Sequence, residues 1–398
     1  MRLLQLVKGL DIGNFNGGAE KFGLELSIGL SEMGEEVHLG VMKRHDTDIE
    51  KQNIFRLTEA GIAPPIFLCE EPRSIIDLKK MKYLKNYLID NRIQIVHSHF
   101  QIGSLIALFL KSSSRDLRLV RTAHISKEWG NGIMAWIGRL LFTNFIFPLA
   151  FDIEVGVSQD IVSQISQRPI NKILQKTAKL IYNALPEKFF TEQFIIETKK
   201  RIELSTRYEE SYIIGSVGRL TKRKGYRYLI EAFSTVIKKY PNLNLILVGD
   251  GEERPFLEKQ IKCLNLSGKV FLVGQQPDSV QWIRKMDLFV LPSLQEGLPT
   301  VVLESMICGT PVISTNISGT RELIKDGETG LLVEPANPLA LSTAIEHLLT
   351  NPILRRQIAE KGFEMSRKFS LHNSVKEYQM LYALQITGDN LPLHRQNL

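Results

Sequence analysis

The sequence predicts an α/β protein of two domains, each with a parallel β-sheet covered by helices. Short apolar runs alternate with helical segments in both halves of the chain, which is typical of repeated strand–helix–strand units. The 398 residues are enough for two domains of ordinary size. A charged helical stretch at 186–210 separates the halves, so we expect one domain at 1–186, the other at 187–369, and a linker between them.

The composition narrows the class of protein. Apolar residues make up 43% of the chain and charged residues 23%, as in ordinary globular proteins. Cys69, Cys263 and Cys308 lie far apart, which argues against a disulfide framework or a cysteine zinc site and fits a reducing compartment. The first apolar run is too short for a signal peptide, so we expect a cytoplasmic protein. The net charge of +7 favours an anionic partner, but no nucleic-acid motif accompanies it.

The first half begins with a predicted strand at 3–7 and a glycine-rich loop at 13–20. Gly17 and Gly18 would let the backbone approach a phosphate closely, although such a pair before a helix is more often a plain tight turn. The next helix places Phe22, Leu26 and Leu30 on one face. Further strands are expected at 36–41, 63–68, 93–96, 119–123 and 153–157, with a helix between 73 and 92.

Histidines follow two of these strands. His97 and His99 are two residues apart, so their side chains face the same way, but no third metal ligand is near them in the sequence. His124 follows the strand at 119–123. It can donate a hydrogen bond or carry a proton, because the pKa of histidine lies near neutrality. The alternative is a histidine that caps the next helix.

The most apolar segment, 133–151, approaches the length of a membrane span. Arg139 and Asn144 fall in its middle, and a central Arg costs on the order of 2.5 kcal/mol on insertion scales. Pro148 interrupts its end. We therefore expect a helix that lies on the sheet or partly in a membrane surface. The helix at 73–92 has a lysine-rich face that could also meet a membrane, but a solvated surface is the simpler interpretation.

The second half opens with a predicted strand at 212–217 and a basic loop from Gly218 to Gly225. This loop lies at the carboxyl end of a strand, where open α/β sheets bind ligands. Arg219 offers a forked guanidinium and Lys224 a point charge, and both bind phosphate oxygens. The alternative is an ordinary solvated loop. Strands at 243–248 and 270–273 follow, the second leading to Gly274.

The stretch 287–322 is the most informative part of the sequence. A predicted strand at 288–291 leads to Glu296 and Gly297, and a helix at 299–306 then carries Glu304. The N-terminus of that helix would attract a phosphate, while a carboxylate accepts hydrogen bonds from sugar or ribose hydroxyls. The alternative is that Glu296 is an exposed loop acid and Glu304 pairs with a lysine. Strands at 311–314 and 327–333 and helices at 339–349, 353–368 and 374–385 complete the chain.

This stretch resembles the donor-site motif of retaining glycosyltransferases of family 4. The family pattern is present as Glu296, Glu304, Gly309-Thr310-Pro311 and Gly319-Thr320-Arg321-Glu322. Ser305 and Ile307 stand where many members have alanine, which changes helix packing but no matched polar group. The glycine pair, the His-x-His and His124 also match the family, so the resemblance covers nearly the whole chain.

The resemblance implies the GT-B fold, with two facing Rossmann-like domains, a cleft between them and a C-terminal helix within 370–398 that packs back on the first domain. It implies that His124 and Glu296 meet the donor sugar and that Arg219 and Lys224 hold the diphosphate. It further implies that Glu304 binds the ribose. The remaining implied substrate-binding residues are Gly17, Gly18, Gly218, Gly274, Gly297, Leu298, Pro299 and Thr300.

The implied function is retaining, metal-independent transfer of a sugar from a nucleotide-sugar, with UDP favoured, and no cofactor. The acceptor would be a glycan or a lipid-linked molecule of bacterial surface polysaccharide biosynthesis, at the inner face of the plasma membrane. Three alternatives remain open: a sugar-nucleotide epimerase of the same fold, a phosphorylase of the pyridoxal type, and an inactive nucleotide-binding scaffold. The intact Arg219, Lys224 and paired glutamates argue against the scaffold.

Overall fold

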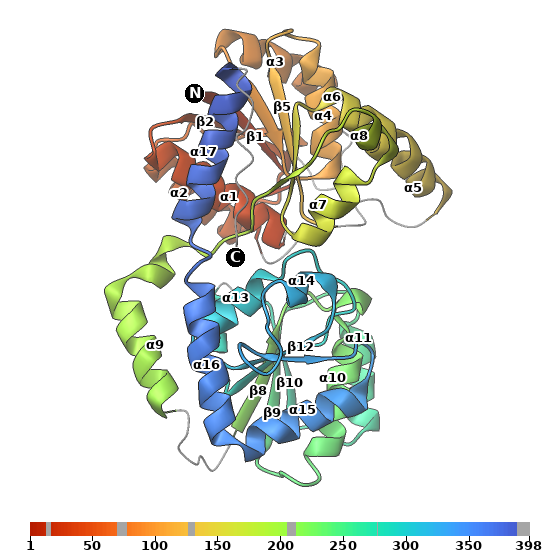
Figure 1. Ribbon diagram of the computed structural model, residues 1–398, viewed down its shortest axis with the longest axis vertical. Helices are drawn as coiled ribbons and strands as arrows, with labels where there is room; N and C mark the ends of the chain where they lie inside the picture. Colours follow the sequence, from red (N-terminus) through yellow and green to blue (C-terminus); the bar gives the residue numbers. More distant parts are fainter. Residues whose placement is uncertain (13–16, 70–77, 126–131, 205–211, 277, 388–398) are drawn as a thin grey trace. The chain divides into compact units, whose positions relative to one another are not determined.

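The computed structural model describes residues 1–12, 17–69, 78–125, 132–204, 212–276 and 278–387 (Figure 1). The chain forms two compact units. The first is Met1–Asn183 together with the C-terminal segment from Leu371, and the second is Ala184–Ser370. Each unit contains one parallel sheet, which confirms the predicted α/β architecture of two Rossmann-like domains.

The sheet of the first unit has the order β3-β2-β1-β4-β5-β6-β7. Strands β2 and β3 follow on one side of β1, and strands β4 to β7 follow on its other side. Its strands are β1 (Arg2–Val7), β2 (Glu36–Lys43), β3 (Ile66–Cys69), β4 (Ile95–Ser98), β5 (Arg118–Ala123), β6 (Ile153–Gly156) and β7 (Lys179–Leu180). Its helices are α1 (Gly18–Glu32), α2 (Asp48–Glu59), α3 (Leu78–Asp90), α4 (Gln101–Lys111), α5 (Ile133–Gly138), the π-helix η1 (Arg139–Ile146), α6 (Phe147–Ala150), α7 (Gln159–Ser166), α8 (Pro169–Ile173) and α17 (Leu371–Thr387).

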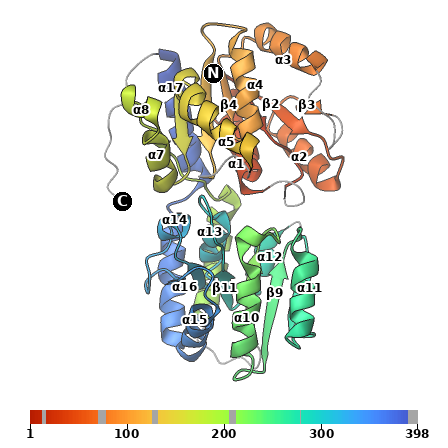
Figure 2. The same ribbon diagram turned by 90° about the vertical axis from the view of Figure 1, so that its right-hand side faces the viewer.

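The sheet of the second unit has the order β10-β9-β8-β11-β12-β13 (Figure 2). Its strands are β8 (Tyr212–Val217), β9 (Leu243–Val248), β10 (Val270–Gly274), β11 (Leu288–Leu291), β12 (Val312–Thr315) and β13 (Leu331–Val333). Its helices are the 3₁₀-helix η2 (Glu187–Phe190), α9 (Glu192–Leu204), the 3₁₀-helix η3 (Lys222–Lys224), α10 (Tyr226–Val236), α11 (Arg254–Cys263), α12 (Ser279–Ile283), α13 (Thr300–Ile307), α14 (Ser318–Arg321), α15 (Pro338–Thr350) and α16 (Pro352–Ser366).

The C-terminal helix α17 belongs to the first unit, as predicted. It packs on α1 so closely that a Cβ added to Gly29 would lie 2.7 Å from Val375 Cγ2. Its Tyr378 and Tyr382 are fully buried, and their hydroxyls reach side chains of the first sheet. The helix therefore completes the core of the first unit.

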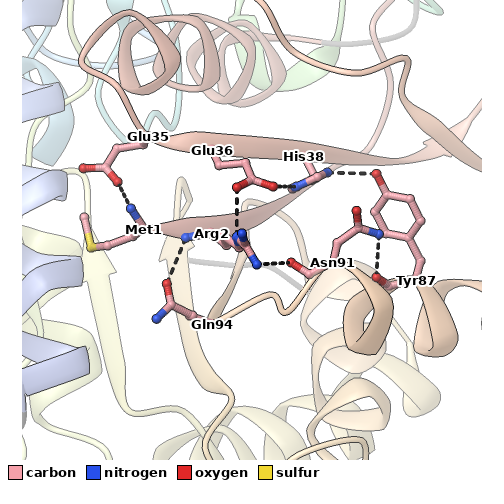
Figure 3. Close-up of polar contacts among 8 residues, drawn as sticks. All are labelled: Met1, Arg2, Glu35, Glu36, His38, Tyr87, Asn91 and Gln94. Atoms are coloured by element: carbon pink, nitrogen blue, oxygen red, sulfur yellow. Dashed lines mark hydrogen bonds and ion pairs between the residues drawn. The ribbon is translucent and has the colours of Figure 1, made fainter.

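A polar network joins the amino ends of β1 and β2 to α3 (Figure 3). The N-terminal amine of Met1 pairs with Glu35, and Arg2 Nε lies 2.8 Å from Glu36 Oε2. On the neighbouring strand, His38 Nδ1 lies 2.8 Å from the hydroxyl of Tyr87 on α3. These contacts fix the sheet edge opposite the carboxyl ends of the strands, which stay available for ligands.

The prediction of a linker at 186–210 is wrong in part, because α9 is a helix of the second unit and packs against it. The guanidinium of Arg201 donates to the carbonyl oxygens of Arg284 and Cys308, at 3.1 and 2.9 Å, and to the hydroxyl of Thr310 at 2.9 Å. These bonds hold the helix against the sheet-forming part of the unit. Residues 205–210 of the predicted linker lie outside the described residues.

Several further segments differ from the sequence-based expectations, among them β13, which begins at Leu331 rather than 327. β3 begins at Ile66 rather than 63, because two prolines that cannot donate to a sheet precede it. β4 continues to Ser98 and includes His97. The apolar segment 133–151 forms α5, η1 and α6 in succession, and no helix of the described chain is long and apolar enough to cross a membrane. Ile76, expected on the inner face of α3, lies outside the described residues.

Candidate functional site

The basic loop after β8 and the loop that contains Glu296 meet at the point where the strand order of the second sheet reverses. Ligands of open α/β sheets bind outside the carboxyl ends of the strands at such a point, here between β8 and β11. Gly225, after the basic loop, has φ +67°, and a Cβ there would lie 2.1 Å from the carbonyl oxygen of Pro292 after β11. Only glycine permits this approach. The approach brings the basic loop and the Glu296 loop together.

Lys224 and Glu296 form an ion pair at this meeting point. Lys224 Nζ lies 2.7 Å from Glu296 Oε1, and the Ser293 hydroxyl donates to the same oxygen at 2.7 Å. The Lys224 side chain is 12% exposed and that of Glu296 9%, so the interpretation of Glu296 as an exposed acid is wrong. Burial raises the pKa of Glu296, but the nearby charges of Lys224 and Arg223 and the hydrogen bonds together hold it below its usual value.

Glycines pack around this pair. A Cβ on Gly218 would lie 2.9 Å from the Tyr226 hydroxyl and 3.3 Å from Lys224 Cε, and a Cβ on Gly249 would lie 2.1 Å from the Gly218 oxygen. The backbone after β8 and β9 therefore closes tightly around Lys224. Arg219, the other predicted phosphate ligand, is exposed on the same loop.

The helix α13 begins beside the pair. Pro299 is its N-cap residue and Thr300 its first residue, one position later than predicted, and the Pro299 side chain makes no capping hydrogen bond. Gly297 and Leu298 are buried just before it, and a Cβ on Gly319 of α14 would lie 2.2 Å from the Gly297 oxygen. The N-terminus of this eight-residue helix, with its positive dipole end, suits an anion.

Glu304 lies on the inner side of α13. It is 3% exposed, and its Oε2 lies 3.5 Å from the Ser279 hydroxyl at the start of α12. A buried carboxylate needs hydrogen-bond donors, so further hydroxyls would be favoured partners. Glu296 therefore lies in the loop before the N-terminus of α13, and Glu304 lies within the helix.

Gly274 ends β10, and the loop after it contains a residue that the sequence motifs do not mark. Gly274 has φ +73°, and its carbonyl accepts from the Gly249 N–H at 2.8 Å. The next residue, Gln275, has a buried side-chain nitrogen without a hydrogen-bond partner in the described part of the chain. Its amide is therefore a candidate donor to a ligand. Pro277 of this loop lies outside the described residues.

In the first unit, Gly17 and Gly18 stand at the start of α1. Gly17 is the N-cap residue, and its N–H donates to Glu20 Oε2 at 2.8 Å. Both glycines are exposed. The preceding loop residues 13–16 lie outside the described residues.

A hydrogen-bonded chain connects α17 to His124, after β5. The carboxamide nitrogen of Gln5 donates to Tyr382 Oη at 3.2 Å, and that hydroxyl lies 2.7 Å from His97 Nδ1. The carboxamide oxygen of Gln5 lies 2.8 Å from His99 Nε2, and His99 Nδ1 lies 3.4 Å from His124 Nε2. His97 and His99 are buried, so they hold the sheet edge together beneath His124.

Polar side chains contact the ring of His124. Its Nε2 lies 3.4 Å from His99 Nδ1. A hydrogen bond with the Asn183 side chain acts to raise the pKa of His124, against the larger effect of burial.

Burial keeps all three imidazoles neutral. It lowers the pKa of His97 and His99 well below the ordinary value and lowers the pKa of His124 to about 3. The expectation of a near-neutral pKa at His124, and with it a proton carrier, is wrong, because desolvation by the surrounding protein disfavours the charged form although the residue stays partly exposed.

A cavity of about 290 Å³ in the first unit lies away from His124. It opens at the amino ends of β5 and β6, between Arg118, Asp152 and Lys176 among others, whereas His124 follows the carboxyl end of β5. The described residues contain no group of three or more His, Cys, Asp or Glu side chains placed to hold a metal ion.

Protein-family models match the sequence of both units. The family model "Glycosyltransferase Family 4" matches residues 16–184, and "Glycosyl transferases group 1" matches 197–365. The N-acetyl-alpha-D-glucosaminyl L-malate synthase of Bacillus anthracis is 25% identical over 92% of this chain and 93% of its own. The lipopolysaccharide core biosynthesis glycosyltransferase LpsE of Rhizobium meliloti is 38% identical, but the match covers 43% of this chain and 49% of LpsE.

Solved structures share the fold across almost the full length. HepE of Anabaena in complex with UDP and glucose has a TM-score of 0.77 at 20% identity, covering 96% of this chain and 99% of that one. Sucrose-phosphate synthase of Thermosynechococcus elongatus also has a TM-score of 0.77 at 20% identity, with coverage of 98% and 100%. The chain therefore belongs to glycosyltransferase family 4 and has the GT-B fold.

Proposed function

We propose that the protein is a retaining, metal-independent glycosyltransferase that moves a sugar from a UDP-sugar to a glycan or lipid-linked acceptor of bacterial surface polysaccharide biosynthesis, at the cytoplasmic face of the plasma membrane. The observation that carries the proposal is the Lys224–Glu296 pair at the switch point of the second sheet, beside the N-terminus of α13. The UDP complexes of HepE support the choice of nucleotide. The role of LpsE in lipopolysaccharide biosynthesis supports the class of acceptor.

In this proposal the second unit holds the donor. Arg219 and Lys224 bind the diphosphate together with the N-terminus of α13, and Glu304 accepts hydrogen bonds from the ribose hydroxyls. Glu296 contacts the donor sugar while its pairing with Lys224 keeps both side chains in place. Gln275 faces the end of the nucleotide that carries the base.

The chemical step depends on charge stabilisation. As the bond between sugar and diphosphate breaks, negative charge grows on the leaving phosphate, and the fixed cations Arg219 and Lys224 stabilise that charge. The leaving phosphate oxygen takes the acceptor proton on the same face of the sugar, so configuration is retained without a carboxylate nucleophile. Neutral His124 in the first unit forms a hydrogen bond with the donor sugar and moves no proton.

Thermal unfolding with UDP, GDP, ADP and CMP, each with and without EDTA, tests the proposal. A nucleotide at 100 times its dissociation constant stabilises the folded state by about 2.7 kcal/mol. We expect UDP alone to raise the unfolding temperature, equally with EDTA. Product made from an α-linked UDP-sugar should show an α-anomeric signal by NMR.

The alternatives give different results. Conversion of a UDP-sugar to its epimer without an acceptor would favour the epimerase. No stabilisation by any nucleotide and no release of UDP from any UDP-sugar would favour the inactive scaffold.

A further inference from the structure

A polar cavity in the first unit lies at the amino ends of β5 and β6, and we call it the amino-edge cavity. Its volume is about 290 Å³. Its wall includes Arg118 at the start of β5, residues 151–154 at the start of β6, and residues 176–178 before β7. Leu384 and Gln385, near the end of α17, form another part of the wall. The cavity is therefore built by segments that lie far apart in the sequence.

The volume of the amino-edge cavity exceeds what one buried water needs. A water molecule takes about 30 Å³ in the liquid, so one bridging water would fill only about a tenth of the space. Small-molecule sites in proteins begin at about 300 Å³. The cavity therefore has the size for one compact molecule, of about the size of a monosaccharide.

Asn171 of α8 brings an unsatisfied acceptor to the wall of this cavity. Its Nδ2 donates to the Ile165 carbonyl oxygen at 2.8 Å and lies 3.5 Å from Glu154 Oε1. Both oxygens are acceptors, so they define the orientation of the amide and Oδ1 lies on its other side. This oxygen is buried and has no hydrogen-bond partner in the described chain. A buried carbonyl oxygen without a donor is destabilising, and a ligand that donates to it would relieve that cost.

Lys176 supplies a donor to the same cavity. Its Nζ donates to the carbonyl oxygens of Pro148 and Phe151, at 2.9 and 3.3 Å. An ammonium group has three N–H bonds, so beside these two contacts one N–H remains for a ligand. The cavity thus combines an acceptor with a donor.

The two carboxylates of the wall already have partners within the protein. Asp152 Oδ1 lies 3.0 Å from Arg118 Nη1. Glu154 Oε2 lies 2.7 Å from Arg121 Nη1 and 2.6 Å from Arg168 Nη1. The second guanidinium beside Glu154 leaves one positive charge in excess, but the cavity wall is formed by other residues. A charged ligand is therefore not needed to balance the carboxylates.

The hydrogen-bonding groups of the wall favour hydroxyl groups. A hydroxyl both donates and accepts, so a molecule with several of them satisfies Asn171 and Lys176 together. An ionised carboxylate or phosphate supplies acceptors only and would leave Asn171 Oδ1 without a donor. An ammonium group supplies donors only and would lie beside that of Lys176.

We propose that the amino-edge cavity is a second binding site, which takes a neutral polyhydroxylated molecule of about monosaccharide size. One hydroxyl of the ligand donates to Asn171 Oδ1, and another accepts from Lys176 Nζ. The site is separate from His124, which follows the carboxyl end of β5. A ligand here connects the start of β6 to the end of α17, and the inference does not rest on the proposed function.

Saturation-transfer NMR of the full chain, with UDP in excess, tests the inference. The neutral probes are glucose, galactose and mannose, and the charged probes are glucuronate and glucosamine. We expect saturation transfer to at least one neutral sugar. Each charged probe should bind at least about tenfold more weakly than the neutral sugar that binds best.

Two variants fill the cavity from different segments. Gln385→Trp on α17 and Thr177→Trp before β7 should each weaken binding of the neutral sugar at least about tenfold. Met380→Trp, at a side chain of α17 that is 66% exposed, is the matched control and should bind the sugar like the wild type. Urea unfolding of the same proteins identifies a variant that has lost its fold.

Three results would overturn the inference. The first is an absence of saturation transfer to all three neutral sugars, which would leave the cavity to water. The second is sugar binding that is unchanged in both folded tryptophan variants of the cavity. The third is tighter binding of glucuronate or glucosamine than of any neutral sugar.

Stabilisation by UDP, measured on the same samples, reports separately on the proposed function. UDP binding without sugar binding would refute the second site alone. Sugar binding that Gln385→Trp removes, in a protein that no nucleotide stabilises, would refute the proposed function and leave the second site standing.

Discussion

Lys224 Nζ and Glu296 Oε1 lie 2.7 Å apart, although 72 positions of sequence separate the two residues. The pair exists because Gly225 lets the loop after β8 touch the backbone after β11. A diphosphate on Lys224 would therefore arrive at a cation whose position is already fixed by a neighbouring carboxylate.

Breaking this pair should destabilise the second unit. In Lys224→Met the Glu296 carboxylate stays largely buried and keeps the hydrogen bond from the Ser293 hydroxyl, and removing one partner of a buried pair costs about 3 kcal/mol. Lys224→Met/Glu296→Gln should cost less, because no charge is left buried. Urea unfolding of the wild type, both single variants and the double variant measures the coupling. Lys239→Met, which breaks an exposed pair with Glu346, should cost under about 1 kcal/mol. Equal losses in Lys224→Met and Lys239→Met would contradict the account.

Glu304→Ala should weaken UDP binding by about tenfold or more, because a hydrogen bond to a charged group contributes about 1.5–3 kcal/mol. Calorimetric titration of UDP measures the loss. Glu304→Gln, which keeps the side-chain volume, separates lost affinity from a cavity in the helix. Glu360→Ala, at an exposed acid paired with Arg356 on α16, is the control and should bind UDP like the wild type. Unchanged affinity in Glu304→Ala would remove the ribose assignment.

Arg219→Ala should reduce turnover more than substrate affinity. The exposed guanidinium meets a charge that is larger in the transition state than in the bound donor, so kcat should fall about 100-fold while KM changes little. Steady-state release of UDP gives both constants. Lys222→Ala, at an exposed lysine of the same loop, should keep kcat close to that of the wild type. A change confined to KM would place Arg219 in ground-state binding only.

The first unit should lose stability as the pH falls below about 6.5, the ordinary pKa of histidine. Burial lowers the pKa of His97, His99 and His124, so the unfolded chain binds more protons than the folded protein below that pH. The lowered pKa of Glu296 acts in the same direction only below about pH 4.5, so the two effects occupy different windows.

Urea midpoints of the full chain between about pH 8 and pH 5 measure this effect. His99→Gln should show a smaller fall than the wild type, and His347→Gln, at an exposed histidine, should show the same fall as the wild type. A wild-type midpoint that is constant over this range would mean that the imidazoles are not kept neutral by the fold.

The sequence predicted the strands that carry the site better than it predicted the site's electrostatics. Periodicity located β8, β9 and β11 at their observed bounds, because buried parallel strands are short apolar runs with clear ends. Their places after predicted strands, together with the family resemblance, indicated Glu296, Lys224 and His124 one at a time. It could not indicate that Glu296 pairs with Lys224, or that burial lowers the pKa of His124 to about 3, because both depend on contacts between distant segments.

Two structural elements also escaped the sequence pattern for tertiary reasons. The charged stretch 192–204 looked like a linker, but Arg201 finds backbone carbonyls in the second unit and turns the stretch into an integral helix. In the apolar segment 133–151, Phe147 N–H bonds to Phe142 five residues back, one residue before Pro148, which has no N–H to donate. An interpretation from residue spacing assumes a regular α-helix, so it does not predict the wider turn of the π-helix η1.

The most direct test of the central claim is calorimetric titration of UDP, in the presence of EDTA, into the wild type, Lys224→Met and His124→Ala. The account predicts that the wild type binds UDP without a metal, that Lys224→Met binds at least about tenfold more weakly, and that His124→Ala keeps the wild-type affinity, because the switch point of the second sheet holds the nucleotide. Wild-type binding that disappears with EDTA, or equal affinity in Lys224→Met, would contradict it.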